Sequence, residues 1–249
     1  MTDHLPRALS FDVAAAQYDA ARPGYPPALF DAVEELTGRP LHGSRVVDVG
    51  AGTGIATRLL RERGARVTAV EPGPGMAAQL RRTLPDIPLV HGLGDALPLA
   101  DCCADLVTYA QSWHWTDPER SVPEALRVLR PGGALALWWN VAPTEVPWIA
   151  EQDKRLRREL SDGAHGAPDP TRHLLNGLNA VRREVRWTRS VPLDLHLANL
   201  GSHSLFLMLG KEATADFLDR ERALLLQVFP DGVVEETYDV ELSVLVATA

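Results

Sequence analysis

The sequence predicts an α/β protein whose core is a doubly wound, mostly parallel sheet of seven strands, with a helical lid. Three observations predict this fold class. From residue 45 onward, short apolar runs alternate with helical patterns. Each run is almost continuously apolar, as expected for strands of a parallel sheet covered on both faces. Hydrophobic residues make up 45% of the 249 residues, so the chain can bury a sizeable core.

The strands and helices can be placed one by one along the chain. The expected strands lie at residues 45–50, 65–72, 88–92, 104–110, 134–140, 181–191 and 239–249. The first two helices, at 57–64 and 75–85, end at Gly64 and Pro85, which are residue types typical of helix ends. Further helices are expected at 118–130, 154–159, 197–210 and 214–229. This alternation indicates a parallel sheet with helices on both faces.

Composition narrows the possible partners and the compartment. The formal net charge of −8 disfavours nucleic acid, because an acidic surface repels phosphate groups. No apolar run is long enough for a membrane span, and the N-terminus does not resemble a signal peptide. Cys102 and Cys103 are adjacent, which suits neither a disulfide nor a zinc site, so reduced thiols in a cytoplasmic protein are expected. The eight histidines show no metal-binding spacing, so no metal is expected. As to oligomeric state, a monomer or a homodimer is expected.

A glycine-rich turn after the first expected strand is the strongest functional signal. In VVDVGAGTGIATRLL, Gly50, Gly52 and Gly54 stand between a strand and a helix, where missing side chains let the backbone approach a ligand. Glu71 ends the next strand about 20 residues later, the usual place for an acid that binds ribose hydroxyls. The pattern predicts a cofactor that contains a nucleoside.

The details of this turn favour one cofactor over others. A dinucleotide fingerprint requires glycine or alanine where this chain has Ile55 or Thr57, and no Gly-Lys-Ser/Thr follows for a P-loop. Asp48 at the end of the strand would repel a pyrophosphate, but it could pair with a cationic amino acid or sulfonium group. S-adenosylmethionine carries both cations and no phosphate, so we predict it as the cofactor.

The same segment, VVDVGAGTG, resembles the D-x-G-x-G-x-G loop of class I S-adenosylmethionine-dependent methyltransferases, which have a Rossmann-like fold. Three further segments resemble that family in order and spacing: AVEPGPGM at 69–76, GDALPL at 94–99 and LRVLRPGGALAL at 126–137. The resemblance implies that the loop binds the cofactor, that Glu71 binds the ribose, and that acid and amide groups of the third segment bind the adenine. The implied cofactor residues are Asp48, Gly50, Gly52, Thr53, Gly54, Glu71, Pro72, Met76, Asp95 and Ala96.

The N-terminal segment FDVAAAQYDAARPGYP, at 11–26, resembles a cover over the cofactor in the small-molecule branch of the family. That branch includes enzymes like the trans-aconitate and ubiquinone methyltransferases, with a methyltransferase type 11 domain. The resemblance implies that Tyr18 and Arg22 reach the methionine end of the cofactor. A guanidinium group can bind a carboxylate through two parallel hydrogen bonds, which makes Arg22 a suitable clamp.

The segment QSWHWTD follows the fourth expected strand, and ligands of open α/β sheets bind at the carboxyl ends of strands. It resembles the Gln-x-x-His-Trp segment of the trans-aconitate-like branch. It lacks the Asn/Asp-Pro-Pro-Tyr/Phe sequence usual in enzymes that methylate nitrogens of bases or amides. Gln111 and Ser112 are expected to contact the cofactor, and Trp113 and Trp115 the acceptor. His114 is either a general base or a packed side chain.

Later residues are expected to complete the acceptor pocket. Trp138 and Trp139 must face opposite sides of their strand, so Trp139, with Asn140, is the candidate for the pocket. His203 is a further candidate, together with His196 and Ser202. Residues 1–40 would form the cover, 41–140 the cofactor-binding core, and 141–249 the lid helices and final strands.

The predicted function is methyl transfer from S-adenosylmethionine to an oxygen or carbon nucleophile of a small-molecule metabolite. The alternative is a protein that binds this cofactor without transferring methyl groups. The sequence leaves open the identity of the acceptor, the use of a general base and the oligomeric state.

Overall fold

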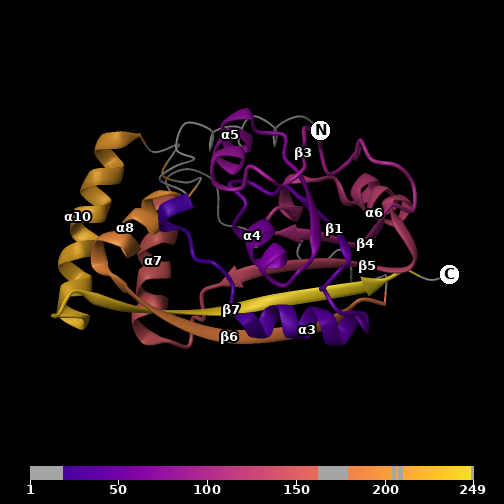
Figure 1. Ribbon diagram of the computed structural model, residues 1–249. Coiled ribbons are helices and arrows are strands. Elements are labelled where there is room, and N and C mark those ends of the chain that lie inside the picture. The colour runs from indigo at the N-terminus through magenta and orange to yellow at the C-terminus, as the bar shows by residue number, and fades with distance from the viewer. Residues whose placement is uncertain (1–18, 162–178, 204–205, 207–209, 248–249) are drawn as a thin grey trace.

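The structure is a computed structural model of the chain, and it describes residues 19–161, 179–203, 206 and 210–247. Seven strands form one sheet in the order β3-β2-β1-β4-β5-β7-β6 (Figure 1). Their bounds are β1 Arg45–Val49, β2 Arg66–Val70, β3 Leu89–Val90, β4 Ala104–Ala110, β5 Leu129–Val141, β6 Val181–Pro192 and β7 Val233–Val246. The sequence-based prediction of a seven-stranded sheet is confirmed.

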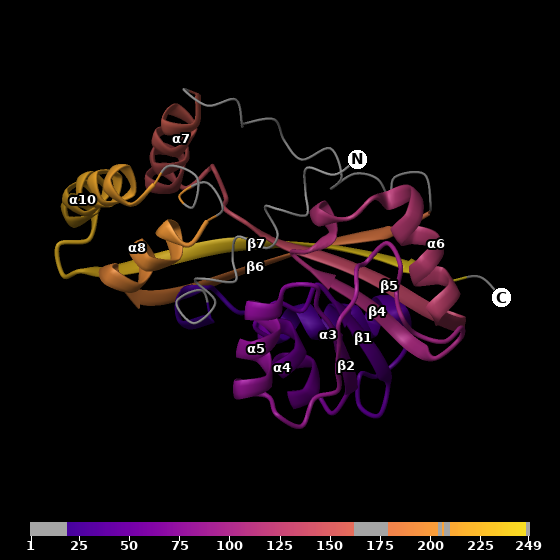
Figure 2. The same cartoon turned by 90° about the horizontal axis from the view of Figure 1, so that it is seen from above.

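The strands β1 to β5 pair in parallel, and β7 inserts between β5 and β6, antiparallel to both. The sheet is therefore mostly parallel, as predicted. The β6–β7 ladder is long and without a register shift: it runs from Val181 paired with Val244 to Pro192 paired with Val233. Figure 2 shows that these two strands continue past the other strands toward a separate group of helices.

Helices cover both faces of the sheet (Figure 2). The helices α3 (Pro27–Thr37), α4 (Ile55–Glu62) and α5 (Pro74–Thr83) pack on one face, and α6 (Pro118–Val128) packs on the other. The first face buries Leu29, Phe30 and Leu60 against alternate strand residues, and the second buries Val128 against the residues between them. This burial of alternate strand residues on opposite faces is the pattern that a sheet with two covered faces requires.

A second group of helices lies at the far end of β6 and β7 (Figure 2), and we call it the cap. The cap consists of α7 (Pro147–Ser161), α8 (Leu193–Gly201) and α10 (Lys211–Val228). Its apolar contacts form two small clusters, one around Leu197 and Leu225 and one around Phe206 and Phe217. None of the helices in the described residues is long and apolar enough to cross a membrane.

Several element boundaries differ from the sequence-based expectations. The helix α6 ends at Val128 instead of residue 130, because Leu129 already pairs with Ala104 in the sheet. The strand β7 begins six residues before the expected position, since the acidic stretch from residue 233 to 238 did not look like a strand. In the structure that stretch pairs with β6, and its Glu236 is buried between strand and cap. Helix α7 likewise begins seven residues earlier than expected, at Pro147.

Candidate cofactor site

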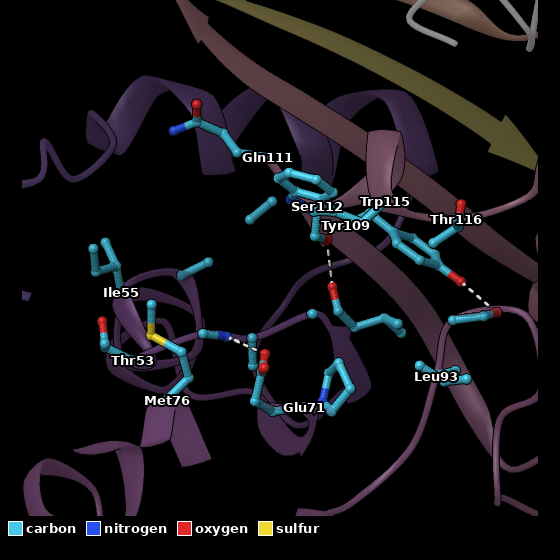
Figure 3. A pocket seen from close by; sticks show the side chains of 18 of the residues that line it. Thr53, Ile55, Glu71, Met76, Leu93, Tyr109, Gln111, Ser112, Trp115 and Thr116 are labelled. Atoms are coloured by element: carbon cyan, nitrogen blue, oxygen red, sulfur yellow. Dashed lines mark hydrogen bonds between the residues drawn. The ribbon is translucent and has the colours of Figure 1, made fainter. Parts of the chain in front are cut away.

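A cavity of about 600 Å³ opens at the carboxyl ends of β1, β2 and β4 (Figure 3). This is the edge of an open α/β sheet at which ligands bind. Many predicted site residues line it: Arg22, Gly50, Gly52, Thr53, Glu71, Pro72, Met76, Asp95, Gln111, Ser112 and Trp115. Others do not line it: Asp48, Gly54, Ala96, Trp113, His114, Trp139, Asn140 and His203. Tyr18 lies outside the described residues.

The glycine loop is shaped by one close contact with the end of β4. Gly50 has a positive φ of 65°, and a Cβ atom there would lie 2.5 Å from the Cβ of Ser112. The Ser112 hydroxyl donates a hydrogen bond to the Val49 carbonyl (2.5 Å), shown as a dashed line in Figure 3. Glycine is therefore needed at residue 50, because both the backbone angle and the space exclude a side chain.

Gly54 has a different role from the one that the resemblance implied. Its φ is 94°, and a Cβ atom would lie 2.9 Å from Leu84 Cδ1 and 3.1 Å from Leu80 Cγ. These leucines belong to the end of α5. Gly54 thus lets the start of α4 pack closely against α5, and it does not contact the cavity.

The Glu71 carboxylate joins the two loops that follow β1 and β2. Its Oε2 accepts a hydrogen bond from the Gly52 amide (2.8 Å), drawn as a dashed line in Figure 3. Its Oε1 accepts one from the Gly73 amide (2.7 Å). The residue is buried yet lies on the cavity wall. A carboxylate oxygen can accept more than one hydrogen bond, so this geometry suits a ligand that carries neighbouring hydroxyl groups.

The Thr53 hydroxyl indicates whether the cavity suits a polar ligand. The residue is 2% exposed and lies on the cavity wall, and its hydroxyl has no hydrogen-bond partner within the part of the chain that is described. A buried hydroxyl without a partner costs about 1–3 kcal/mol. A ligand that supplies this partner would remove the cost, so the wall of the cavity is suited to a polar occupant.

Asp48 does not take the position that the sequence suggested. Its carboxylate is fully buried beneath the loop and accepts hydrogen bonds from Thr57 Oγ1 (2.6 Å) and Thr108 Oγ1 (3.0 Å). Burial raises its pKa to about 6, and the two threonine hydroxyls limit this rise. The expected contact with a cationic ligand is thus wrong for this geometry, because the side chain joins β1 to α4 and β4 instead.

Of the two adenine-binding groups expected in the segment 94–99, only Asp95 lines the cavity, and the Ala96 amide does not. Asp95 lines the cavity, and its Oδ1 accepts hydrogen bonds from the Asp117 amide and the Ser121 hydroxyl, both at 2.9 Å. It therefore holds the first turn of α6 at the wall. The Ala96 amide, expected to face an adenine ring, instead donates to the Leu93 carbonyl (3.2 Å) within a tight turn.

The tryptophans of QSWHWTD divide between core and cavity. Trp113 to Trp115 form a short 3-10 helix, η2. Trp113 is fully buried and packs edge-on against Tyr109, with ring centroids 4.7 Å apart, so its expected contact with an acceptor is wrong. Trp115 lines the cavity. The His114 ring packs against the Trp115 ring, with ring centroids 4.6 Å apart, and does not itself line the cavity. The position of His114 fits support of Trp115 better than proton transfer.

Trp138 and Trp139 face opposite sides of β5, as the strand geometry predicted, but both are buried in the core. Trp139 therefore does not reach the acceptor pocket. Asn140 does not line the cavity either: its Nδ2 donates to the Gly24 carbonyl (3.1 Å), and its Oδ1 accepts from Trp187 Nε1 (3.1 Å). Asn140 thus holds the N-terminal segment that lies beside the cavity.

Arg22 reaches the cavity from this N-terminal segment, and its Nη2 donates to the Ser202 carbonyl at the end of α8 (3.3 Å). His203 follows Ser202 but does not line the cavity. Burial, together with the positive charge of Arg22, lowers the pKa of His203 to about 3, so its imidazole is neutral at physiological pH. His196 is buried farther into the cap, against Glu236.

Sequence reasoning missed other residues on the wall, of which Tyr25 is the most informative. Its hydroxyl accepts a hydrogen bond from Gln111 Nε2 (3.4 Å), and its ring packs edge-on against Trp138. Gln111 has a φ of 55°, which is unusual for a residue other than glycine and is concentrated at functional sites. The available signal was the position of Tyr25, three residues after Arg22 in the same segment. Ile55, Leu93, Thr116, Asp117 and Arg120 also line the cavity without having been predicted.

The described residues contain no group of three or more His, Cys, Asp or Glu side chains placed to hold a metal ion. The fold and the site together define a doubly wound α/β protein with a cavity suited to a nucleoside cofactor.

Comparisons with known proteins agree with this class. Residues 47–137 match the family described as "Methyltransferase domain". An uncharacterized methyltransferase of Mycobacterium tuberculosis is 38% identical over 221 residues, 87% of this chain and 86% of its own. A demethylmenaquinone methyltransferase of Renibacterium salmoninarum is 35% identical over 47% of this chain and 50% of its own. The structure of a putative type II methyltransferase from Anaeromyxobacter dehalogenans superposes with a TM-score of 0.68 at 24% identity, over 91% of this chain and 98% of that one.

The chain therefore belongs to the class I S-adenosylmethionine-dependent methyltransferases, and it is an enzyme of methyl transfer.

Proposed function

We propose that the protein binds S-adenosylmethionine in this cavity and transfers its methyl group to an oxygen or carbon nucleophile of a small-molecule metabolite. One observation carries the proposal: groups suited to the three parts of the cofactor line a single cavity. They are the guanidinium of Arg22, the carboxylate of Glu71 and the carboxylate of Asp95. These match a carboxylate, a ribose diol and an adenine amino group, respectively.

The remaining wall fits the same cofactor. Met76 and Leu93 offer apolar contact to a flat base, and the Thr53 hydroxyl offers a polar group without a partner among the described residues. The loop carries no lysine, and Ile55 and Thr57 stand where a dinucleotide fingerprint requires glycine or alanine. These features support S-adenosylmethionine over a dinucleotide.

The bound cofactor would supply an electrophilic methyl group on a positively charged sulfur. The protein must align the acceptor with that methyl group and keep water out. Trp115 and Tyr25 present aromatic side chains on the wall, and an aromatic face also attracts a sulfonium group. Gln111 orients the Tyr25 hydroxyl through its side-chain amide. Preorganised groups of this kind are how a site lowers a barrier without reorganising during the reaction.

The class of acceptor is supported by two further features. QSWHWTD occupies the place where enzymes that methylate amide or base nitrogens usually carry Asn/Asp-Pro-Pro-Tyr/Phe, and this chain lacks that sequence. In addition, the relative from Renibacterium salmoninarum is a demethylmenaquinone methyltransferase by name. Both favour a small-molecule acceptor.

A labelling experiment tests the proposal. The protein is incubated with S-adenosylmethionine carrying an isotope in the methyl group and with chromatographic fractions of a bacterial small-molecule extract. We expect label to enter at least one fraction, and we expect the Glu71→Ala variant to transfer much less. If S-adenosylhomocysteine binds the protein in calorimetry but no fraction gains label, the protein binds the cofactor without this transfer. If neither result is obtained, the proposed cofactor is wrong.

A further inference from the structure

Three side-chain hydrogen bonds attach residues 21–24, which we call the anchor segment, to the C-terminal half of the chain. Arg189 Nη2, on β6, donates to the Ala21 carbonyl (3.3 Å). Asn140 Nδ2 donates to the Gly24 carbonyl (3.1 Å). Arg22 Nη2 itself donates to the Ser202 carbonyl (3.3 Å). The segment that carries Arg22 to the cavity is thus held by strands and a helix far away in the sequence.

The guanidinium of Arg189 is fixed by a buried acid. Its Nε donates to Glu236 Oε2 (2.6 Å), and the Tyr238 hydroxyl donates to the same oxygen (2.9 Å). The Glu236 side chain is 2% exposed. A guanidinium group is planar, and its donors point in fixed directions. Binding Glu236 through Nε therefore directs Nη2 toward Ala21.

A second contact keeps Glu236 in place and ionised. The other oxygen of Glu236 lies 2.7 Å from His196 Nδ1, and His196 Nε2 lies 3.1 Å from Gln152 Nε2. The Gln152 amide nitrogen also donates a hydrogen bond to Glu221 Oε2, which identifies it as the donor group of this side chain. It therefore donates to His196 Nε2 as well, and Nε2 must accept. The histidine proton is then on Nδ1 and points at Glu236. Burial by itself would raise the pKa of Glu236. The hydrogen bond from His196, with the charge and hydrogen bond of Arg189, outweighs burial and holds this pKa below its usual value.

The anchor has a direct geometric consequence for Arg22. The Ala21 carbonyl and the Arg22 amide belong to one planar peptide unit. Fixing the carbonyl oxygen therefore fixes the direction in which the chain enters Arg22. Residue 21 is itself buried, so the peptide has little room to rotate.

We propose that Arg189 is a positioning residue of the cofactor site, which holds the Ala21 carbonyl so that Arg22 presents its guanidinium to the carboxylate of the bound cofactor. The inference rests on the proposed function, since it assigns Arg22 to that carboxylate. The simpler explanation is that Arg189 and Glu236 form a buried ion pair that only stabilises the junction of sheet and cap. The two explanations differ in what happens to ligand affinity.

Two ligands and a conservative variant separate these explanations. S-adenosylhomocysteine contains the amino acid carboxylate, whereas 5′-methylthioadenosine has the same adenosine and sulfur without it. In Arg189→Lys the positive charge opposite Glu236 remains, but one ammonium group cannot reproduce two donors that point in different directions. Arg189→Gln removes the charge as well. The affinities of both variants for both ligands are measured by isothermal titration calorimetry.

We expect both variants to bind S-adenosylhomocysteine about five- to ten-fold more weakly, the effect of one lost hydrogen bond on the placement of Arg22. Their affinity for 5′-methylthioadenosine should change less than about two-fold, because that ligand has no group for Arg22. Arg22→Gln should reproduce the same difference between ligands. The double variant Arg22→Gln/Arg189→Lys should lose no more affinity than Arg22→Gln alone, because both substitutions act through one contact.

A matched control comes from a second ion pair between β6 and β7. Arg186 donates to Asp239 through Nε and Nη2, both at 2.7 Å, and its further acid partner is Glu145, which is separate from Glu236 and the anchor segment. Arg186→Gln should lower the unfolding temperature while leaving both affinities unchanged. If Arg189→Gln does not fold, Arg189→Lys decides the question, because it keeps a charge beside Glu236.

The proposal is overturned if Arg189→Lys binds S-adenosylhomocysteine as tightly as the unaltered protein does. It is also overturned if both ligands lose affinity equally, since the effect would then not pass through Arg22. If the unaltered protein binds neither ligand, the proposed function fails first, and the role of Arg189 fails with it.

Discussion

The loops that form the cavity and the cap are held together in different ways. The loops at 50–54, 71–73 and 111–117 are shaped by backbone: positive φ angles at glycines, a side chain that would collide with Ser112, and two amides bound by Glu71. The cap is held by side chains, above all Glu221 with Arg155 within it and Glu236 with Arg189 where β6 and β7 meet it. A backbone-shaped site tolerates few substitutions but needs few partners, whereas the cap depends on partners far apart in the chain.

The largest loss of stability should come from adding a side chain at Gly50, where the loop after β1 approaches Ser112 most closely. In Gly50→Ala, the new Cβ would lie 2.5 Å from Ser112 Cβ at a φ of 65°. We expect the free energy of unfolding to fall by about 4 kcal/mol, from overpacking and backbone strain together. Urea denaturation measures it. Gly52→Ala is the matched control: its φ is 59° but its Cβ would meet open space, so about 1 kcal/mol is expected. Equal losses in the two variants would contradict the close contact.

The next largest effect is a pH dependence of stability caused by the ionisation of Asp48. Because burial raises its pKa to about 6, the folded protein holds this proton more tightly than the unfolded chain does. The resulting stabilisation is present in full below about pH 4 and disappears as the pH rises through about 6. Between pH 4 and 7.5 the unaltered protein should lose roughly 3 kcal/mol of unfolding free energy from this source. Asp48→Asn lacks the ionising group and should not show this loss, so its stability relative to the unaltered protein rises by the same amount. Urea denaturation across this pH range measures the difference.

Asp105 serves as the control for that pH profile. Burial raises its pKa, but the Arg45 amide and the charges of Arg45 and Arg130 outweigh burial and hold the pKa below its usual value. Its contribution is present above the unfolded pKa and is lost as the pH falls, so Asp105→Asn should change the profile in the opposite direction. A profile for Asp48→Asn parallel to that of the unaltered protein would show that Asp48 is not the source.

A smaller effect should follow removal of the acid that joins the two loops. Glu71→Ala should weaken binding of S-adenosylhomocysteine by about 1–3 kcal/mol, because charge-assisted hydrogen bonds are lost. Glu71→Gln should also weaken it, since the amide nitrogen cannot accept a bond from the Gly52 or Gly73 amide. Isothermal titration calorimetry measures both variants. Unchanged affinity in Glu71→Ala would remove this residue from the cofactor site.

The smallest effect is expected at His114. Its ring packs on Trp115 and does not line the cavity, so His114→Ala should slow methyl transfer less than about three-fold. The initial rate of label transfer into the accepting extract fraction measures this. A loss of about 100-fold, typical of a removed general base, would return His114 to the chemistry.

The same contrast explains which features could be predicted from the sequence. The glycines and Glu71 belong to short patterns whose meaning is local, so strand, turn and acid could be placed together. Asp48 was misplaced because its direction depends on Thr57 and Thr108, two partners on other elements. Trp139 was misplaced because an apolar side chain on a strand can face core or cavity, and the sequence does not say which.

The cap was harder to predict for a related reason. Glu236 made the start of β7 look polar, because its partners, Arg189 and His196, lie far away in the sequence. The contact between Arg189 and Ala21 joins residues 168 positions apart, and no local pattern records such a distance. Side-chain networks of this kind become visible only when the fold is assembled.

The central claim is that the cavity binds an adenosyl amino acid and no pyrophosphate. It is tested most directly by calorimetric titration of the unaltered protein with S-adenosylhomocysteine and, separately, with NAD. The account predicts binding of S-adenosylhomocysteine at one site per chain and no binding of NAD. Binding of NAD without binding of S-adenosylhomocysteine would contradict it.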